Sequence, residues 1–315
     1  MKAVVTGGAG FIGSHLVDAL VARGDEVTVI DNLSTGNLRH IARHLDSGAA
    51  RFVGKDLLGE GWQDAVQGAD RVYHLAADPD VRASAGNPST VYAQNVTATV
   101  RVLEAMREAG CGEVVFTSTS TVYGEADLIP TPEEYPGMQP ISIYGSTKLA
   151  CEAMISGYAH TYGWRSWVFR FANIIGERSN HGVIWDFIQK LRANPRELEI
   201  LGDGRQQKSY CPVSVCVDAV LFAVDRTNEP FSCFNIGTED WIDVTSIASI
   251  VTAEMGLRGV SFRYTGGDRG WVGDVPRMLL SVEKLKSLGW RPGMTSEAAV
   301  REAARALLRE TGQIP

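Results

Sequence analysis

Short runs of apolar, often β-branched residues alternate with longer helix-like segments through the first half of the chain. Six runs predict strands, over residues 3–6, 26–30, 50–53, 71–75, 113–118 and 166–171. The segments between them predict helices over residues 14–23, 61–67, 89–109 and 142–162. Strands that alternate with helices form a parallel sheet, and right-handed crossovers place helices on both of its faces. The pattern therefore predicts an α/β fold with a doubly wound parallel sheet.

The rhythm loosens after about residue 173, where Gly, Pro and Asn recur more often and the predicted helices are shorter. These helices are expected over residues 184–193, 214–226, 245–255 and 296–309. We therefore predict two domains. One is formed by residues 1–172, joined by parts of 207–236, and the other is a smaller α/β lobe over residues 173–315.

The composition is that of an ordinary globular protein, with 315 residues, 44% hydrophobic and 21% charged. The 37 acidic residues and 30 Lys and Arg give a net charge of −7, whereas electrostatic binders of nucleic acid carry the opposite bias. No apolar run approaches the ~18 residues of a membrane span, and the first residues are unlike a signal peptide. The five cysteines are scattered without metal-ligand spacing. We expect a cytoplasmic protein that binds no nucleic acid, membrane or metal.

A glycine-rich turn follows the first predicted strand and leads into the first predicted helix. It contains Gly7, Gly8, Gly10 and Gly13, and matches both GxGxxG and GxxGxxG. Glycine there allows a tight turn, close approach of the backbone to a pyrophosphate, and close packing of helix on strand. The helix N-terminus adds free N–H groups and the positive end of its dipole. The turn predicts a Rossmann-type dinucleotide-binding domain.

Two carboxylates follow the next two predicted strands. Asp31 ends the second strand, 18 residues after Gly13. A carboxylate there accepts hydrogen bonds from the adenosine ribose hydroxyls and repels a 2′-phosphate, which favours NAD over NADP. Asp56 follows the third strand, where it either borders the adenine or simply caps a helix.

Tyr144 and Lys148 lie four residues apart at the start of a predicted helix, so they share one helix face. A cation beside a phenol lowers the pKa of the phenol, and a Tyr that titrates near neutrality is a competent general base for a sugar hydroxyl. Ser118 and Thr119 follow the fifth predicted strand. Ligands bind at the carboxyl ends of parallel strands, so these hydroxyls are expected to face the nicotinamide and a reacting oxygen.

Together these elements resemble the extended short-chain dehydrogenase/reductase family, and within it the nucleotide-sugar 4-epimerases of the UDP-glucose 4-epimerase type. The resemblance covers nearly the whole chain. It is carried by residues 6–17, 31–36, 74–77, Asn95, 117–124, 144–148, 170–173 and 273–276. It implies a carbohydrate-metabolising isomerase with tightly bound NAD. Such an enzyme interconverts UDP-glucose and UDP-galactose through a transient 4-keto sugar.

The resemblance also implies a role for each matching residue. Tyr144 is the catalytic base, and Lys148 bonds the nicotinamide ribose while lowering the pKa of Tyr144. Thr119, with Ser118 beside it, falls at the catalytic Ser/Thr position. The implied cofactor-binding residues are Gly7, Gly10, Phe11, Ile12, Gly13, Asp31, Asn32, Ser34, Gly36, Asp56, Leu57, Leu75, Ala76, Ala77, Asn95, Tyr144 and Lys148. The second lobe would bind the nucleotide-sugar. The implied substrate-binding residues are Thr119 at the catalytic position and, in the second lobe, Asn173, Val183, Ile184, Glu199, Leu201, Lys208 and Asp274.

Three positions of the second lobe depart from the family pattern. Lys208 stands where many members have a phosphate-binding Arg, and a point charge there replaces a bidentate fork. Trp271 replaces an Arg two residues before a Gly-Asp pair, which leaves the charge of the diphosphate clamp open. Met278 occupies a pocket-wall position, and its flexibility leaves an N-acetylated sugar open as a substrate.

Other functions stay open beside the UDP-glucose 4-epimerase. One is a sibling activity: a UDP-GlcNAc or UDP-glucuronate 4-epimerase, or a UDP-glucuronate decarboxylase. Another class is a non-catalytic NAD-binding regulator. A 4,6-dehydratase is disfavoured, because Ser120 and Thr121 stand where that enzyme carries Asp and Glu. The resemblance also implies a homodimer formed by the helix over residues 89–109 and the helix after Tyr144.

Overall fold

The computed structural model describes residues 1–312 and divides the chain into two compact units. The first unit comprises Met1–Val122, Ser142–Arg170 and Val220–Phe234. The second comprises Tyr123–Ile141, Phe171–Ala219 and the residues from Asn235 onward. The units therefore interleave along the chain. The segment Tyr123–Ile141 groups with the second unit.

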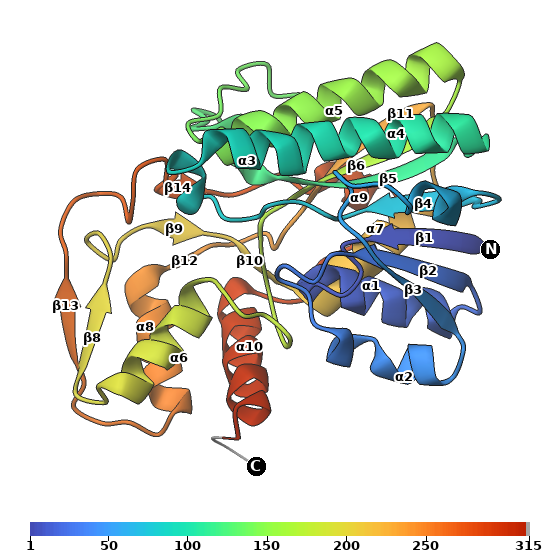
Figure 1. Ribbon diagram of the computed structural model, residues 1–315. Coiled ribbons are helices and arrows are strands. Elements are labelled where there is room, and N and C mark those ends of the chain that lie inside the picture. Colours follow the sequence, from blue (N-terminus) through green and yellow to red (C-terminus); the bar gives the residue numbers. More distant parts are fainter. Residues whose placement is uncertain (313–315) are drawn as a thin grey trace. The chain divides into compact units, whose positions relative to one another are not determined.

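The first unit is built on a seven-stranded sheet (Figure 1), which confirms the predicted doubly wound α/β fold. Its strands are β1 (Lys2–Thr6), β2 (Glu26–Asp31), β3 (Ala50–Gly54), β4 (Arg71–His74), β5 (Glu113–Thr119), β6 (Arg165–Phe171) and β11 (Phe231–Ile236). They lie in the order β11-β6-β5-β4-β1-β2-β3. The strands are short and largely buried, as expected where helices cover both faces of a sheet.

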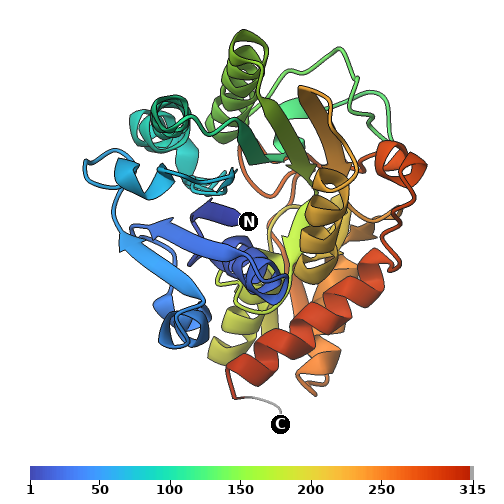
Figure 2. The same ribbon diagram turned by 90° about the vertical axis from the view of Figure 1, so that its right-hand side faces the viewer.

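Helices cover both faces of this sheet. Figures 1 and 2 show α4 and α5 on one face and α1 and α2 on the other. The helices are α1 (Phe11–Ala22), α2 (Ala42–Asp46), α3 (Pro88–Tyr92), α4 (Ala98–Ala109), α5 (Ile143–Tyr162) and α7 (Val213–Val224), which continues from the second unit into the first. Single turns are formed by η1 (Leu38–His40), η2 (Gln63–Val66), η3 (Ala83–Ala85), η4 (Ala93–Thr97) and η5 (Ser120–Tyr123).

Two of the predicted helices take a different form. The segment 61–67 is only the 3₁₀ turn η2. The segment 89–109 is one helical run in which the π-helical turn η4 separates α3 from α4. A π turn inside an α-helix is frequent at functional sites, and this one carries Asn95.

The second unit has short strands and a group of three packed helices. The strands are β7 (Asn173–Ile175), β8 (Glu197–Ile200), β9 (Gln207–Lys208), β10 (Tyr210–Pro212), β12 (Ile242–Asp243), β13 (Ser261–Tyr264) and β14 (Arg277–Met278). The helices are α6 (Val183–Ala193), α8 (Val244–Glu254), α9 (Glu283–Ser287) and α10 (Ser296–Glu310). Helices α6, α8 and α10 lie side by side (Figure 1), and their buried side chains share one apolar core.

The parallel register brings the ends of the central strands together. Thr6 at the end of β1 pairs with Ile30 of β2 on one side and with His74 of β4 on the other. His74 in turn pairs with Phe116 of β5. Because these strands are parallel, the residues that follow each of them lie along one edge of the sheet, where ligands of such folds bind.

Candidate active site

The glycine-rich turn has the tight geometry that the sequence predicts. Gly7 has φ +69°, and a Cβ on it would lie 2.8 Å from the backbone nitrogen of Ala76. A Cβ on Gly13 would lie 2.1 Å from the carbonyl oxygen of Gly7. Any side chain at either position would therefore push apart the turn, the first helix or the end of β4.

Helix α1 begins at Phe11 directly after this turn. Its cap position is Gly10, which has no side chain to accept the N–H groups of the first turn. The first N–H groups of a helix have no partner within the helix. Phe11 and Ile12 therefore begin the helix at a terminus built to meet an anion.

Asp31, at the end of β2, closes the other side of the turn. One carboxylate oxygen accepts the N–H of Ala9 at 3.0 Å and the other accepts the N–H of Leu33 at 2.7 Å. Gly36 packs against the same carboxylate, because a Cβ on Gly36 would lie 3.0 Å from Asp31 Oδ1. The segment that carries Ser34 thus folds back over the glycine-rich turn.

The end of β3 is tied to the same edge. Asn32 donates its side-chain amide to Asp56 at 2.9 Å, and the other oxygen of Asp56 accepts the N–H of Leu58 at 2.8 Å. Leu57 is buried in the core. The structure therefore places Asp56 beside Asn32, and its carboxylate also fixes the local turn.

Asn95 connects the segment after β4 to helix α5. Its side chain accepts the N–H of Asp78 at 2.8 Å and donates to the hydroxyl of Thr147 at 2.9 Å. Leu75, Ala76 and Ala77, which precede Asp78, are partly buried. Asn95 is itself 1% exposed, so its contacts hold this segment and α5 in place.

Thr119 is buried, and Tyr144 is partly buried. Thr119 is the last residue of β5, and Tyr144 lies in the first turn of α5, which Ser142 caps by accepting the N–H of Gly145. Burial raises the pKa of Tyr144, and a side-chain hydrogen bond with Thr119 acts in the lowering direction. The net direction is opposite to the lowering expected from the sequence, because desolvation of the phenolate outweighs the stabilising contacts.

Lys148 lies one helical turn after Tyr144 and is 2% exposed. Its ammonium group lies 4.2 Å from the centre of the Phe116 ring on β5. Burial lowers the pKa of Lys148 to about 8, and Cys151 and Glu152 act in the raising direction. Among residues 1–312 no carboxylate lies within ion-pairing distance of this ammonium.

His74, at the end of β4, is a structural residue. Its ring nitrogens lie 2.7 Å from the hydroxyl of Thr6 and 2.9 Å from that of Thr99. Burial and the charge of Lys148 lower the pKa of His74 to about 3. The imidazole therefore stays neutral at physiological pH and is already fully hydrogen-bonded.

The sequence reasoning assigned no role to a buried ion pair next to these residues. Arg170 of β6 contacts both carboxylate oxygens of Glu152 on α5, and Ser118 donates its hydroxyl to the same carboxylate. Glu152 is four residues after Lys148 and eight after Tyr144. That spacing along one helix face is the signal that points to it.

These residues of the first unit fit a dinucleotide. The turn offers bare backbone and a helix terminus to a pyrophosphate, and Asp31 offers a buried carboxylate to ribose hydroxyls. No basic side chain contacts Asp31 within the described chain. That charge pattern suits an unphosphorylated ribose.

In the second unit, the predicted substrate residues fall into separate groups. Asn173 begins β7 and donates its side-chain amide to the carbonyl of Ser209 at 3.1 Å. Val183 and Ile184 form the first turn of α6, and Ile184 is buried in the core of the three helices. Asn173 thus lies next to the segment that carries Lys208, whereas Ile184 has a packing role.

The carbonyls of Glu199 and Leu201, two of the implied substrate-binding residues, are already engaged. The carbonyl of Glu199 accepts a hydrogen bond from Lys190 at 3.3 Å. The carbonyl of Leu201 accepts one from Gln206 at 3.4 Å. Both bonds are long, and their donors are flexible side chains, so these carbonyls are reachable by a ligand once the side chains move.

Lys208 and Asp274 form the charged cluster of this unit. Their side chains lie 2.5 Å apart, and Asp274 is 3% exposed. The Lys208 ammonium also lies 5.3 Å from the centre of the Trp271 ring, whose buried Nε1 has no hydrogen-bond partner. Arg269 donates to the carbonyl of Asp274 at 2.9 Å and pairs with Glu125 at 2.7 Å.

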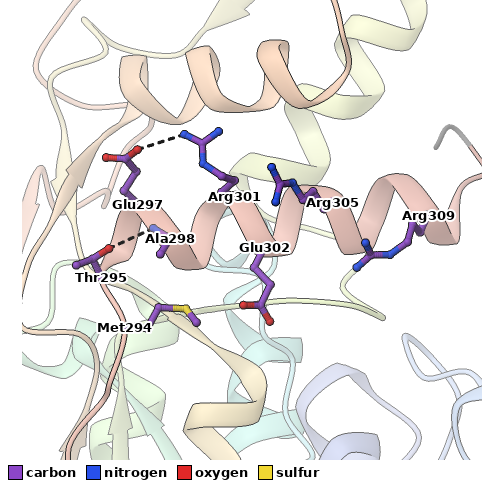
Figure 3. A pocket seen from close by; sticks show the side chains of 8 residues that line it. All are labelled: Met294, Thr295, Glu297, Ala298, Arg301, Glu302, Arg305 and Arg309. Atoms are coloured by element: carbon purple, nitrogen blue, oxygen red, sulfur yellow. Dashed lines mark hydrogen bonds and ion pairs between the residues drawn. The ribbon is translucent and has the colours of Figure 1, made fainter. Parts of the chain in front are cut away.

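A separate hollow of about 500 Å³ lies along α10. Figure 3 shows the side chains that line it, with Glu297 joined to Arg301 on one side of the helix and Glu302 on the other. Arg301 and Arg305 also pair with Glu254 of α8. The hollow contains none of the predicted site residues, and its arginines support helix packing.

The model of one protein family, described as the NAD dependent epimerase/dehydratase family, matches residues 3–237. The chain belongs to the NAD dependent epimerase/dehydratase family. This confirms the resemblance to extended short-chain dehydrogenases/reductases and the predicted dependence of the family on NAD. The match includes the glycine-rich turn, Asp31, Tyr144 and Lys148.

Relatives within this epimerase/dehydratase family carry more than one activity. A solved structure of UDP-galactose 4-epimerase is 46% identical and has a TM-score of 0.88, covering 98% of this chain and 99% of the other. A UDP-glucose 4-epimerase of Mycolicibacterium smegmatis is 33% identical over 93% of this chain and 94% of its own length. UDP-glucuronic acid decarboxylase 2 of Arabidopsis thaliana is 30% identical over 93% of this chain and 65% of its own length.

Proposed function

We propose that the protein is a UDP-hexose 4-epimerase that interconverts UDP-glucose and UDP-galactose and keeps NAD bound throughout. The observation that carries this proposal is the placement of the partly buried Tyr144 with two buried groups, its hydrogen-bonding partner Thr119 and the ammonium of Lys148 one helical turn further on. The relatives support the choice of substrate, because a UDP-galactose 4-epimerase shares 46% of its residues with this chain. A regulator that only sensed NAD would need none of these three side chains.

In this proposal the first unit holds NAD. The residues that would contact it are Gly7, Gly10, Phe11, Ile12, Gly13, Asp31, Asn32, Ser34, Gly36, Asp56, Leu57, Leu75, Ala76, Ala77, Asn95, Tyr144 and Lys148. The chemistry that NAD supplies when bound is the reversible two-electron oxidation of a sugar carbon. Because the overall reaction is an isomerisation, the cofactor is regenerated in each turnover.

The side chains of this chain supply the proton transfer. Tyr144 accepts the proton of the C4 hydroxyl while C4 is oxidised. It returns the proton to the C4 oxygen when the transient 4-keto sugar, having turned its other face, is reduced again at C4. Thr119 would stabilise the phenolate by hydrogen bonding, and the charge of Lys148, one helical turn away, would add to this stabilisation. The burial of Lys148 and the partial burial of Tyr144 strengthen such interactions.

The second unit would hold the nucleotide. Asn173, Lys208 and Asp274 are the proposed contacts to the diphosphate and ribose, and Val183, Ile184, Glu199 and Leu201 are the proposed contacts of the nucleotide end. A sibling activity on UDP-glucuronate is the second candidate, since a decarboxylase shares 30% of its residues with this chain. A 4-keto intermediate with a carboxylate at C5 loses carbon dioxide readily, so both reactions can follow from the same oxidation.

We also propose a homodimer formed by the helical run from α3 to α4 and by α5. Exposed apolar side chains on and beside these helices support it, including Tyr92 (56% exposed) and Tyr162 (49% exposed). The protein is proposed to act without nucleic acid or membrane. No helix within residues 1–312 is long and apolar enough to cross a bilayer.

The test is incubation of the purified protein with UDP-glucose, UDP-galactose, UDP-GlcNAc and UDP-glucuronate, with products identified by NMR. We expect interconversion of the first pair with no net rise in absorbance at 340 nm. Release of carbon dioxide from UDP-glucuronate would establish the decarboxylase instead. No conversion of any sugar, with NAD bound, would favour a regulator. Light scattering on the same sample measures the dimer.

A further inference from the structure

We propose that Ser118, Glu152 and Arg170 form a buried positioning chain that holds Thr119 against Tyr144. This inference rests on the proposed function, because it concerns the same reacting face. The three residues come from β5, α5 and β6. They are 4%, 4% and 5% exposed, so the chain lies inside the first unit.

The contacts within this chain are bidentate and charged. Arg170 Nε lies 3.1 Å from each carboxylate oxygen of Glu152, and Nη2 lies 2.7 Å from Oε2. Ser118 donates its hydroxyl to Oε1 of the same carboxylate. Planar fork-to-carboxylate contacts fix orientation as well as distance. The carboxylate therefore anchors the end of β5 to α5 and β6 at once.

The position of the anchor relates it to the reacting groups. Ser118 immediately precedes Thr119, whose hydroxyl accepts the N–H of Thr121 at 3.2 Å and lies near enough to Tyr144 for their side-chain hydrogen bonding to act on the pKa of Tyr144 in the lowering direction. Glu152 lies two helical turns after Tyr144 on the same face of α5. A shift of the strand end against the helix would therefore change the distance between Thr119 and Tyr144 directly.

Stability alone gives a weak reason for burying these charges. Taking an ion pair out of water costs free energy that its own attraction offsets only in part, and apolar residues of similar volume often serve as well. The hydroxyl of Ser118 also needs an acceptor when buried. The Glu152 carboxylate accepts from both Arg170 and Ser118 and so fixes one geometry for the three side chains. A reaction that depends on orientation requires such a fixed geometry.

Glu152 also acts on the charge of Lys148. The groups that face this ammonium are His74 from β4, the Phe116 ring from β5, and Cys151 and Glu152 from α5. His74 is neutral, and Glu152 is the carboxylate among these groups, with Arg170 behind it. Burial lowers the pKa of Lys148 to about 8 and Glu152 acts in the raising direction. Removal of the carboxylate charge is therefore expected to make Lys148 lose its proton at lower pH.

The experiment uses the full chain with NAD and compares Ser118→Ala, Ser118→Thr and Glu152→Gln. We expect Ser118→Ala and Glu152→Gln to lower kcat by about tenfold to a hundredfold, with KM within about twofold. Ser118→Thr restores the hydroxyl and is expected to restore most of kcat. In Glu152→Gln the alkaline limb of the pH profile of kcat moves to lower pH.

Glu113→Gln is the matched control. Glu113 begins β5 and pairs with Arg71 at 2.6 Å and also with Arg165, so this variant weakens a partly buried Arg–Glu cluster at the opposite end of the same strand. It is expected to lower Tm while leaving kcat and the pH profile unchanged. If Ser118→Ala and Glu152→Gln also lower Tm without changing kcat or the pH profile, the positioning chain of Ser118, Glu152 and Arg170 has only a structural role. The inference is then wrong.

Two further outcomes are decided in the same way. If Glu152→Gln does not fold, Ser118→Ala with its Ser118→Thr rescue decides alone. If the wild type converts no UDP-sugar, the proposed function fails, and the positioning chain is then tested by crystal structures of the wild type and Ser118→Ala. The distance between the hydroxyl oxygens of Thr119 and Tyr144 should increase in Ser118→Ala. An unchanged distance would overturn the inference.

Discussion

Lys148 on α5 and Lys208 on β9 are both largely buried, but their charges are balanced differently. Lys148 is 2% exposed and faces an aromatic ring, with no carboxylate within ion-pairing distance in residues 1–312. Lys208 lies 2.5 Å from Asp274. Burial lowers the pKa of Lys148 to about 8 because nothing nearby fully compensates its charge. Lys148 is therefore available to an anion that develops during a reaction, whereas Lys208 is already paired with the carboxylate of Asp274.

The same difference extends to the neighbours of each lysine. Beside Lys208, Arg269 pairs with Glu125 and lies 4.0 Å from Asp268, so carboxylates already balance the cations of this cluster. In the proposed function, an incoming diphosphate would compete with these carboxylates for its donors. Lys148, by contrast, has no paired carboxylate within residues 1–312, so a phenolate at Tyr144 would not have to displace one. Under the proposed function, the charge of Lys148 is therefore available to a phenolate that forms at Tyr144. Lys208, by contrast, would have to exchange Asp274 for a phosphate group.

The largest expected effect comes from removing the phenol. Tyr144→Phe should lower kcat by about a thousandfold or more, because general acid–base catalysis is lost, while NAD stays bound. Turnover of UDP-galactose and the NAD content of the purified protein measure the two quantities. Tyr158→Phe on the same helix is the control, since its hydroxyl bonds Glu104 away from the reacting groups. A kcat within tenfold of the wild type in Tyr144→Phe would contradict the proposed base.

The next effect concerns stability and pH. Lys148 has a pKa of about 8 in the fold against 10.5 as a free side chain. Between these values the unfolded chain binds more protons, so stability rises with pH through this window. We expect a gain of about 2 kcal/mol in the free energy of unfolding from pH 8 to pH 10 at ~1.36 kcal/mol per pKa unit.

Denaturant unfolding of the ligand-free protein at several pH values measures this gain. Lys148→Met should remove the slope, so the difference between the two proteins isolates the lysine from other titrations. The window should end near pH 10, because the pKa of Tyr144 is raised and its effect on stability has the opposite sign above that pH. Parallel curves for wild type and variant would show that the Lys148 charge is compensated after all, and the contrast with Lys208 would disappear.

Much of the first unit is predictable from sequence because its signals are local. The glycine-rich turn occupies seven residues, and each glycine answers to a specific close contact, such as that between Gly13 and Gly7. The four-residue spacing of Tyr144 and Lys148 fixes one shared helix face without any tertiary information. All six strands predicted in the first half occur, because their apolar runs are long enough to show a pattern.

The features that sequence does not reveal depend on contacts between distant segments. The partner of Arg170 is Glu152 on another element, and nothing local pairs them. Strands such as β9 and β12 have two residues each, which is too short for any periodicity. The direction of the pKa shift of Tyr144 depends on burial, which spacing along a helix does not give. The ion partner of Lys208 likewise lies 66 residues away.

The smallest effects are expected in the nucleotide cluster, where removal of a cation and removal of a carboxylate should act in opposite directions. Lys208→Met should weaken binding of UDP by about tenfold, as for loss of a charged hydrogen bond, and leave kcat nearly unchanged. Glu125→Gln should tighten binding of UDP about twofold to threefold at low salt, because Arg269 loses its competing carboxylate.

Calorimetric titration with UDP at low and high salt measures both variants, and Lys286→Met is the control because its ammonium pairs with Glu239 and Glu283. The gain in Glu125→Gln should vanish at high salt, since screening weakens an exposed charge more than a buried one. Equal affinity in Lys208→Met and wild type would mean that Lys208 serves only to neutralise Asp274. The diphosphate would then depend on other donors. The unpartnered Nε1 of Trp271, whose ring lies 5.3 Å from the Lys208 ammonium, is one candidate.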